Sequence, residues 1–195
     1  MQQKIVYIND IAKLSAGINL SRERNAMPES SVYTSKNHET DLVSGFSEQS
    51  LYNIDIRKES HILKAGDIIV NLGTRRCAVV SRENEDKIIR NSFVKIELKN
   101  SFIYPWFLCY SINESSIFKE SIKTDVLSVV RPLSVSILGR ARLYLPDMDT
   151  QKRIGDSYRD LCRVRYLTEK RNELLMTAFN KIVNTNVEEI NNGRE

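Results

Sequence analysis

The last quarter of the chain repeats its apolar residues at intervals of three and four, which is the spacing of a helix with one apolar face. No proline occurs after Pro146, and Asp147 or Asp149 can accept hydrogen bonds from the free amides of a helix start. We therefore predict one long helix over 147–184, followed by a polar tail over 185–195. The predicted apolar seam, interrupted by polar residues near its middle, consists of Ile154, Tyr158, Leu161, Val164, Leu167, Leu174, Leu175, Phe179 and Ile182.

The predicted helix is longer, in ångströms, than the diameter of the domain that precedes it. Residues 150–183 alone, at about 1.5 Å each, span roughly 50 Å, whereas a domain of about 150 residues is on the order of 30–40 Å across. Part of the apolar seam should therefore meet another helix, in an antiparallel coiled coil or a bundle. The alternative is a helix that packs along its own domain, with its arginines facing solvent.

The segment before the helix is rich in short apolar runs separated by turn residues. The runs at 68–72, 77–80 and 92–98 are broken by Gly66-Asp67, Gly73-Thr74 and a polar turn near Glu83. This pattern predicts a meander of at least three strands.

Further elements flank the predicted meander. Residues 5–8 (IVYI) read as a short strand, and 9–50 is polar and irregular, with SSVYTS as its only strand-like piece. Pro105 opens the apolar segment YPWFLCYSINES, which suits a short buried helix, and RARLYL reads as a final strand before Pro146. The predicted class is thus α+β, with a mixed, β-rich domain over 1–146 followed by one long C-terminal helix.

Charge changes this picture because it is concentrated in the predicted helix. The net charge of the chain is +4, and residues 150–183 alone carry eight Lys or Arg against four Asp or Glu. Residues 1–149 carry a net charge of +2 and are nearly balanced, so any nucleic acid would have to be bound through local basic patches.

Several common chemistries are absent from the sequence. The seven glycines do not form a GxGxxG or GxxxxGK phosphate loop, and neither His38 nor His61 lies near a candidate catalytic triad. The three cysteines are odd in number and far apart along the chain, which argues against a disulfide framework and a zinc site. The longest apolar stretch is too short for a membrane span and no secretory signal is recognisable, so we expect a cytoplasmic protein without a membrane partner.

One candidate metal site has to be weighed. Asp67, followed by Glu85, Asp86 and Lys87, has the order of an Asp then Glu-x-Lys nuclease centre, in which two carboxylates hold Mg²⁺. Glu85, however, lies in the polar turn RENED, whereas both carboxylates would need rigid, adjacent strands. A Mg²⁺-dependent nuclease is therefore a remote alternative, and we predict no metal ligands.

The order of these segments resembles one half of the specificity subunit of type I restriction-modification systems. The resemblance lies in LKAGDIIVNLGTRRCAVV, NSFVKIEL, YPWFLCYSINES and a strand that runs through Pro146 into the helix, with Gln151 and Ile154 at the junction. It covers nearly the whole chain. Members of the family usually hold two recognition domains and two spacer helices, whereas this chain has one of each.

The resemblance implies sequence-specific binding of double-stranded DNA by a non-catalytic subunit. A half-subunit would pair with a copy of itself or with a second half through antiparallel spacer helices, so that the helix separates two half-sites. The expected partners are a methyltransferase subunit and, in a complete system, a restriction subunit. S-adenosylmethionine, ATP and Mg²⁺ would be bound by those subunits, and this chain would need no cofactor.

Under this reading, polar loop residues should read bases and nearby basic residues should grip phosphates. The candidates for base reading are Arg22, Arg24, Tyr33, Ser35, Asn37, Arg75 and Arg76. The candidates for phosphate contact come from a segment with a local excess of positive charge and are Lys123, Arg131, Arg140 and Arg142. The alternative for Arg75 and Arg76 is a solvated hairpin tip.

A second hypothesis belongs to another class of function. The chain could be a dimerising interaction protein or regulator that occupies the modification subunit without directing it to a DNA site. The two hypotheses share the partner-binding helix and differ in whether the β-rich domain selects a sequence.

Overall fold

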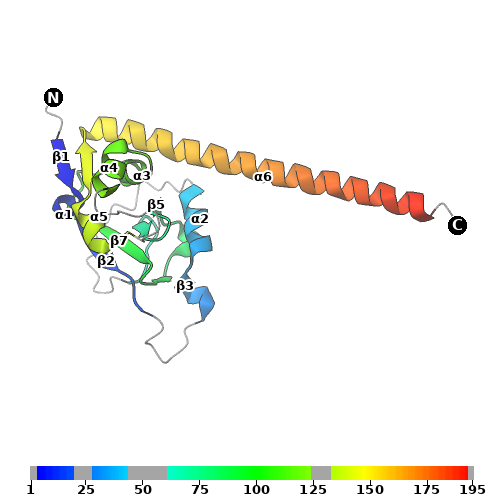
Figure 1. Ribbon diagram of the computed structural model, residues 1–195, viewed down its shortest axis with the longest axis horizontal. Coiled ribbons are helices and arrows are strands. Elements are labelled where there is room, and N and C mark those ends of the chain that lie inside the picture. The colour runs from blue at the N-terminus through cyan, green and yellow to red at the C-terminus, as the bar shows by residue number, and fades with distance from the viewer. Residues whose placement is uncertain (1–3, 20–27, 44–60, 124–132, 193–195) are drawn as a thin grey trace.

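The computed structural model describes residues 4–19, 28–43, 61–123 and 133–192, and it confirms the predicted α+β class. The described residues before Met148 form a β-rich body. One long helix, α6 (Met148–Asn192), follows this body, and most of it projects beyond the body (Figure 1). The predicted start of this helix is correct, but its end is not. Residues 185–192 continue the helix instead of forming a tail, because no proline or glycine interrupts the chain between Gly155 and Gly193.

An antiparallel four-stranded sheet forms the centre of the body. Its strand order is β2 (Ala12–Ala16), β7 (Phe93–Leu98), β4 (Ile68–Asn71) and β5 (Arg76–Val79). The three strands of the predicted meander are confirmed, but their connection is not a meander. β7 pairs with β4 and not with β5, since the chain between β5 and β7 leaves this sheet.

That intervening chain forms a separate pairing. It contains a short 3₁₀ helix, η3 (Arg82–Asn84), and β6 (Ile88–Ile89), which pairs in parallel with β3 (Val32–Tyr33). A second 3₁₀ helix, η2 (Glu29–Ser31), leads into β3.

The predicted strands at the two ends of the body pair with each other. β1 (Lys4–Tyr7) runs antiparallel to β8 (Arg142–Leu145), which leads through Pro146 into α6. Two short helices flank this pair, α1 (Ile8–Ile11) and α5 (Val135–Arg140). The start of the chain therefore supports the strand that positions α6.

Helices cover both faces of the central sheet. α3 (Pro105–Asn113) is the predicted buried helix, and it packs between β5 and α6, with α4 (Ser116–Lys123) beside it. Alternation along the strands sends Val70 and Val94 to this side, and Ile69 and Phe93 to a second apolar cluster. α2 (Ser35–Val43) contributes Leu42 to that second cluster.

Two features of the described residues bear on earlier expectations. No helix among them is both long enough and apolar enough to cross a lipid bilayer. All three cysteines are buried, and the Sγ atoms of Cys77 on β5 and Cys109 on α3 lie 3.3 Å apart. Cys77 and Cys109 are therefore neighbours in space although they lie far apart in the sequence.

Candidate functional site

The N-terminal end of α6, which we call its root, is held to the body through the second and third turns of the helix. Gln151 is buried: its Nε2 donates to the carbonyl oxygens of Phe102 and Pro146, and its Oε1 accepts from the amide of Tyr104. Asp147 caps the helix by accepting from the amide of Thr150 at 2.9 Å, as predicted. The direction in which α6 leaves the body is therefore set by hydrogen bonds as well as by packing.

Close backbone approach completes this junction. A Cβ atom on Gly155 would stand 2.6 Å from the ring of Tyr104 and 2.7 Å from the backbone nitrogen of Phe107. The hydroxyl of Tyr104 donates to Asp156 at 2.6 Å, and Asp156 also accepts from Arg159. Only glycine allows α6 to lie this close to the start of α3.

Beyond the junction, the predicted apolar seam has no cover from the body. Seven of its nine residues are exposed, by 45–69%. The exposed seam, as we call this set, consists of Leu161, Val164, Leu167, Leu174, Leu175, Phe179 and Ile182. An isolated helix would not hold so many large apolar side chains in water without a partner surface.

The other two seam residues lie against the body. Ile154 is half-buried, and Tyr158 is buried beside α3, where its hydroxyl accepts from Nδ2 of Asn113 at 2.9 Å. Most of the Tyr158 ring therefore packs within the chain, which leaves only its edge for a partner helix.

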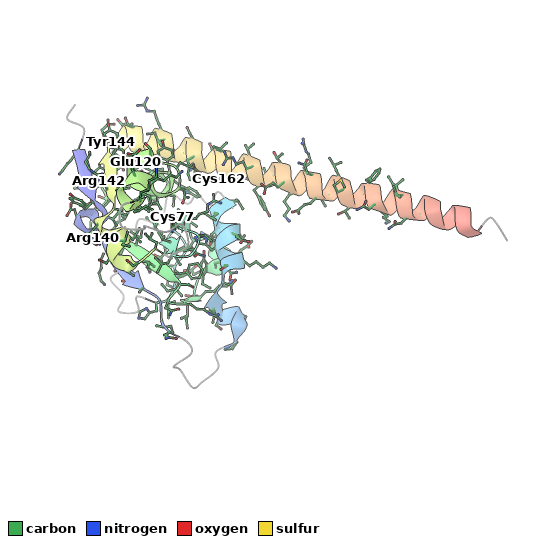
Figure 2. All side chains as sticks on the ribbon, in the orientation of Figure 1. Cys77, Glu120, Arg140, Arg142, Tyr144 and Cys162 are labelled. Atoms are coloured by element: carbon green, nitrogen blue, oxygen red, sulfur yellow. The ribbon has the colours of Figure 1, made fainter. Side chains whose placement is uncertain are left out.

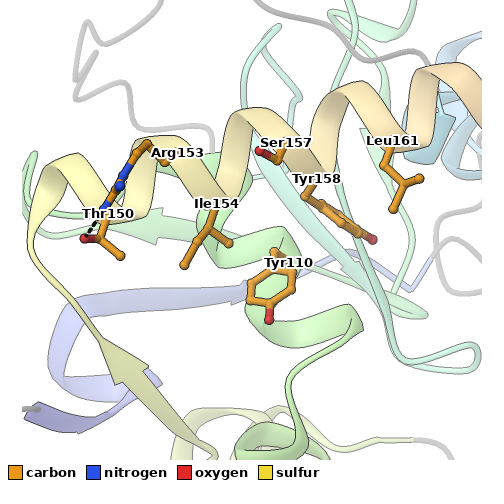
Figure 3. A pocket seen from close by; sticks show the side chains of 7 residues that line it. All are labelled: Tyr110, Thr150, Arg153, Ile154, Ser157, Tyr158 and Leu161. Atoms are coloured by element: carbon orange, nitrogen blue, oxygen red, sulfur yellow. Dashed lines mark hydrogen bonds between the residues drawn. The ribbon is translucent and has the colours of Figure 1, made fainter.

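A shallow groove joins the body to the exposed seam. Its volume is about 490 Å³, and α3 contributes Tyr110 to its wall. Figure 3 shows the residues from α6 that line it, which are Thr150, Arg153, Ile154, Ser157, Tyr158 and Leu161. Tyr110 and Tyr158 meet edge to face with ring centroids 5.8 Å apart, so the floor of the groove is aromatic.

Three of the four predicted phosphate-binding residues lie in the part of the chain that the structure describes, and they gather at one edge of the body. Lys123 ends α4, Arg140 ends α5, and Arg142 begins β8; all three are exposed. The amide of Arg142 donates to Oγ of Ser121 at 3.0 Å, which fastens the start of β8 to α4. The exposed Glu120 lies on the same helix, and Figure 2 labels it with Arg140 and Arg142. Arg131 lies outside the described residues.

Arg75 and Arg76 occupy the turn between β4 and β5, away from that edge. Arg75 is half-buried with a φ of 60°, and its amide donates to the carbonyl oxygen of Asn71 at 2.8 Å. Arg76 is exposed, and it lies near Cys162 of α6. Burial raises the pKa of Cys162, and the positive charges of Arg165 and Arg76 oppose that rise. The structure thus separates the predicted basic residues into two groups.

The predicted base-reading residues near α2 need correction. Tyr33 is 0% exposed, and its hydroxyl donates to the buried carboxylate of Asp41 at 2.7 Å. Burial and the neighbouring Asp41 hold the pKa of Tyr33 well above its usual range. Tyr33 therefore packs in the second apolar cluster and is not available to a base.

Ser35 and Asn37 lie in the first turn of a helix where a loop was expected. Ser35 is exposed, so it remains a candidate. Asn37 is half-buried, and its Oδ1 accepts from both the amide and the hydroxyl of Thr34, at 3.0 and 2.7 Å. The carboxamide of Asn37 thus closes the start of α2. Arg22 and Arg24 lie outside the described residues.

The candidate nuclease carboxylates are engaged by lysines. Asp67 forms an ion pair with Lys95 at 2.6 Å; burial raises the pKa of Asp67, and the charge of Lys95 opposes that rise. Asp86 and Glu85 pair with Lys64 instead, at 2.8 and 3.6 Å. Within the part of the chain that the structure describes, no three His, Cys, Asp or Glu side chains are grouped so as to hold a metal ion.

No family model and no curated protein matches the sequence. Solved structures do match it in fold. The S subunit of a type I restriction-modification system from M. genitalium is 14% identical, with a TM-score of 0.50 over 91% of this chain and 43% of that one. A chain from a study of complex assembly and conformational transition of the type I R-M system is 12% identical, with a TM-score of 0.52 over 90% and 42%.

A further match is the HsdS subunit from Thermoanaerobacter tengcongensis, which is 16% identical, with a TM-score of 0.48 over 90% of this chain and 48% of that one. The chain therefore spans about half the length of the structures it matches. At these identities the likeness establishes the fold, which is that of one half of a type I specificity subunit. The fold expected from the sequence resemblance is confirmed.

Proposed function

We propose that this chain is the sequence-specific DNA recognition half of a type I restriction-modification specificity subunit. The observation that carries the proposal is a fold shared over about nine-tenths of the chain with such subunits, together with a projecting helix whose apolar seam is exposed. A recognition domain on a stiff helix suits a molecule that must hold two DNA-reading units at a fixed distance.

In this proposal the chain has no catalytic role of its own. Methyl transfer from S-adenosylmethionine belongs to the methyltransferase subunit, and cleavage driven by ATP with Mg²⁺ belongs to the restriction subunit. The chain directs both to a DNA site and binds no cofactor. Its carboxylates Asp67 and Asp86 serve in ion pairs, which fits a structural role for them.

The body would contact DNA through two separate groups of side chains. Lys123, Arg140 and Arg142 supply positive charge at one edge of the body and would bind phosphates, since such contacts need charge but carry no sequence information. Arg75 and Arg76, with Ser35 on α2, remain candidates for base reading; an arginine can bind guanine through two hydrogen bonds. Arg22, Arg24 and Arg131 keep the roles proposed from the sequence.

The exposed seam of α6 would be covered by the helix of a second half, which is either another copy of this chain or a separate half-subunit. Two recognition domains would then read a bipartite DNA site. The methyltransferase subunit would bind the paired helices on their remaining faces.

One observation favours the second candidate function, a dimerising regulator that occupies the methyltransferase subunit without selecting a sequence. The partner surface on α6 is extensive, whereas Tyr33 and Asn37, two proposed base readers, are engaged inside the body. This candidate predicts binding to the methyltransferase subunit with no preferred DNA sequence.

Selection from random DNA by the chain, purified with a type I methyltransferase subunit, separates these functions. Recognition predicts enrichment of a two-part motif. Salt-sensitive binding without an enriched motif would favour the regulator. Cleavage of DNA by the isolated chain with Mg²⁺, lost in Asp67→Ala, would instead revive the nuclease.

A further inference from the structure

The polar middle of α6 divides a regular heptad pattern into two apolar halves. Starting at Ile154, steps of three and four residues follow one stripe of the helix, the positions a and d of a coiled coil. The heptad stripe consists of Ile154, Ser157, Leu161, Val164, Thr168, Arg171, Leu175, Ala178, Ile182 and Thr185. All of these residues are exposed except Ile154, which is half-buried, so the stripe faces away from the body along its whole length.

The six central positions of this stripe, from Leu161 to Ala178, have the same order of apolar and polar side chains in both directions. Apolar residues lie on each side of Thr168 and Arg171, which are its polar centre. A stripe of this kind can match a reversed copy of itself, with apolar residues against apolar residues and the polar pair against the polar pair.

Building on the function proposed above, we propose that α6 pairs antiparallel with α6 of a second copy in one defined register, in which Val164 faces Leu175 of the other chain. The same register sets Leu161 against Ala178, and Thr168 against Arg171. Ser157 then faces Ile182, and Ile154 faces Thr185. A two-fold axis passes between residues 169 and 170.

The residues flanking the stripe support this register independently. On one flank, Asp160 comes beside Lys181 of the second copy, and Leu167 comes beside Leu174. This pairing covers Leu167 and Leu174, which are 55% and 69% exposed in the single chain. Opposite charges and apolar side chains are thus matched in the same alignment.

Neighbouring registers lose these matches. A shift of one heptad in one direction brings Arg165 beside its own copy and Arg153 beside Lys181. A shift in the other direction separates Asp160 from Lys181 and sets Leu167 against Lys181. Like charges in the first case, and a lysine against a leucine in the second, oppose pairing, so the alignment centred between residues 169 and 170 is favoured.

The polar centre also favours the antiparallel direction. In a parallel pair, identical residues share a layer, so Arg171 would face Arg171 inside the interface. Two guanidinium groups in one apolar layer are costly because neither finds an anionic partner there. In the antiparallel pair each Arg171 shares its layer with the small, polar Thr168.

The groove at the root of α6 gives this pairing a specific contact with the body. In the proposed register, Phe179 of the second copy comes beside Tyr158, and Ile182 comes beside Ser157; both of these root residues line the groove. Phe179 would complete an aromatic cluster with Tyr158 and Tyr110, whose rings already meet edge to face. The groove is continuous with the exposed seam through Leu161 (Figure 3).

Disulfide cross-linking of the full chain tests the register. Val164→Cys and Leu175→Cys chains are prepared separately, mixed to allow exchange, and oxidised with glutathione disulfide. Each inter-chain disulfide forms from two thiols as glutathione disulfide is reduced to two glutathione molecules. We expect a linked dimer in the mixture, and little from either variant alone, because identical positions lie about 16 Å apart along the pair.

Matched mixtures supply the controls for this experiment. Val164→Cys with Thr168→Cys reports one shifted register, and Val164→Cys with Ile182→Cys reports the other. The wild-type chain controls for its own three cysteines, which are buried. Faster linking in either shifted mixture, or linking of Val164→Cys to itself as in a parallel pair, would overturn the proposal.

Sedimentation of point variants tests the groove. Phe179 and Met176 are both 58% exposed in the single chain, but only Phe179 lies on the flank of the stripe that reaches the groove. Phe179→Ala should weaken self-association at least about tenfold, as loss of a buried aromatic contact does at interfaces, whereas Met176→Ala should leave it unchanged.

Equal effects of Phe179→Ala and Met176→Ala would overturn the groove contact. A chain that stays monomeric and pairs only with a helix of the methyltransferase subunit would overturn the second copy as the occupant. Neither result bears on whether the body selects a DNA sequence, so the proposed function fails or stands by the separate selection experiment.

Discussion

Tyr104 lies so close to Gly155 that a Cβ atom on Gly155 would stand 2.6 Å from Cδ1 of the tyrosine ring. This contact joins the loop before α3 to the third turn of α6. Since Gln151 binds the backbone amide of Tyr104 from the preceding turn, both residues fix the helix to the body.

Gly155→Ala should therefore destabilise the chain by about 1–3 kcal/mol, the usual effect of an added methyl group in a packed site. The backbone of Phe107 blocks one direction of relief, because its nitrogen is 2.7 Å from the same Cβ position. Thermal unfolding should show a lower Tm than for wild type or for Lys152→Ala, an exposed position on α6. Equal Tm values for the three proteins would contradict this packing.

Stability should fall in acid because of His38. Burial lowers the pKa of His38 to about 4 from an ordinary value of 6.5, and its Nε2 has no hydrogen-bond partner in the described structure. Between pH 6.5 and 4 the unfolded chain binds a proton at His38 that the folded chain does not. The contribution of neutral His38 to the free energy of unfolding is therefore complete above pH 6.5 and declines as the pH falls below it. The decline amounts to about 3 kcal/mol at most.

Urea unfolding at several pH values measures this dependence. The slope of the unfolding free energy between pH 4 and 6.5 should be shallower in His38→Gln than in wild type. Ser35→Ala, at an exposed position on the same helix, introduces and removes no titratable group and should keep the wild-type slope. An unchanged slope in His38→Gln would remove His38 as its cause.

Leu175→Asp should abolish self-association and leave the body folded. Leu175 is 60% exposed in the single chain, so a carboxylate there is hydrated in the monomer but would be buried against a partner. Light scattering should report a monomer with an unchanged circular dichroism spectrum. Glu173→Ala, outside the heptad stripe, should still associate; a Leu175→Asp chain that associates like wild type would place the interface elsewhere.

Arg142→Ala should weaken DNA binding to all sequences alike. A phosphate contact supplies affinity without specificity, so its loss should lower the salt dependence of log K by about one unit of slope. Lys13→Ala is a suitable control, because Lys13 is already paired with Glu97 at 3.1 Å on β2. A change in sequence preference without a change in salt slope would instead make Arg142 a base reader.

The sequence predicted those elements whose apolar pattern is complete within a short segment. Ile68–Asn71 and Phe93–Leu98 are strands, Pro105–Asn113 is a helix, and Asp147 caps α6. In each case local periodicity or a capping residue agrees with the tertiary structure. The seam of α6 was visible for the same reason.

α2 could not be predicted in this way, because it buries polar side chains. Asp41 on its inner face is 0% exposed and accepts from the amide of Ser81 and from Asn84, both far away in the sequence. The segment therefore looks like a polar loop until these partners are known. This is why Asn37 was assigned to base reading, although its side chain closes the start of a helix.

The anchoring residues of α6 were missed as functional positions for a related reason. From the sequence alone, Gln151 is only a residue of the junction after Pro146, and Gly155 is only a glycine outside any phosphate loop. Their roles depend on contacts with Phe102 and Tyr104, which only the folded chain brings together. A glycine inside a long predicted helix is the signal that could have pointed to this close contact.

The most direct test of the account is sequence selection on DNA by two forms of the chain, each with the methyltransferase subunit. One is wild type; the other duplicates residues 168–174 and so lengthens α6 by one heptad. In the proposed register the two Tyr158 positions lie about 35 Å apart, near one turn of B-DNA, and the duplication adds about 10 Å, or about three base pairs. We predict a two-part motif from both forms, with the same half-sites and a spacing about three base pairs longer in the second. No enriched motif, or one whose spacing is unchanged by the longer helix, would contradict a recognition domain held at a distance by α6.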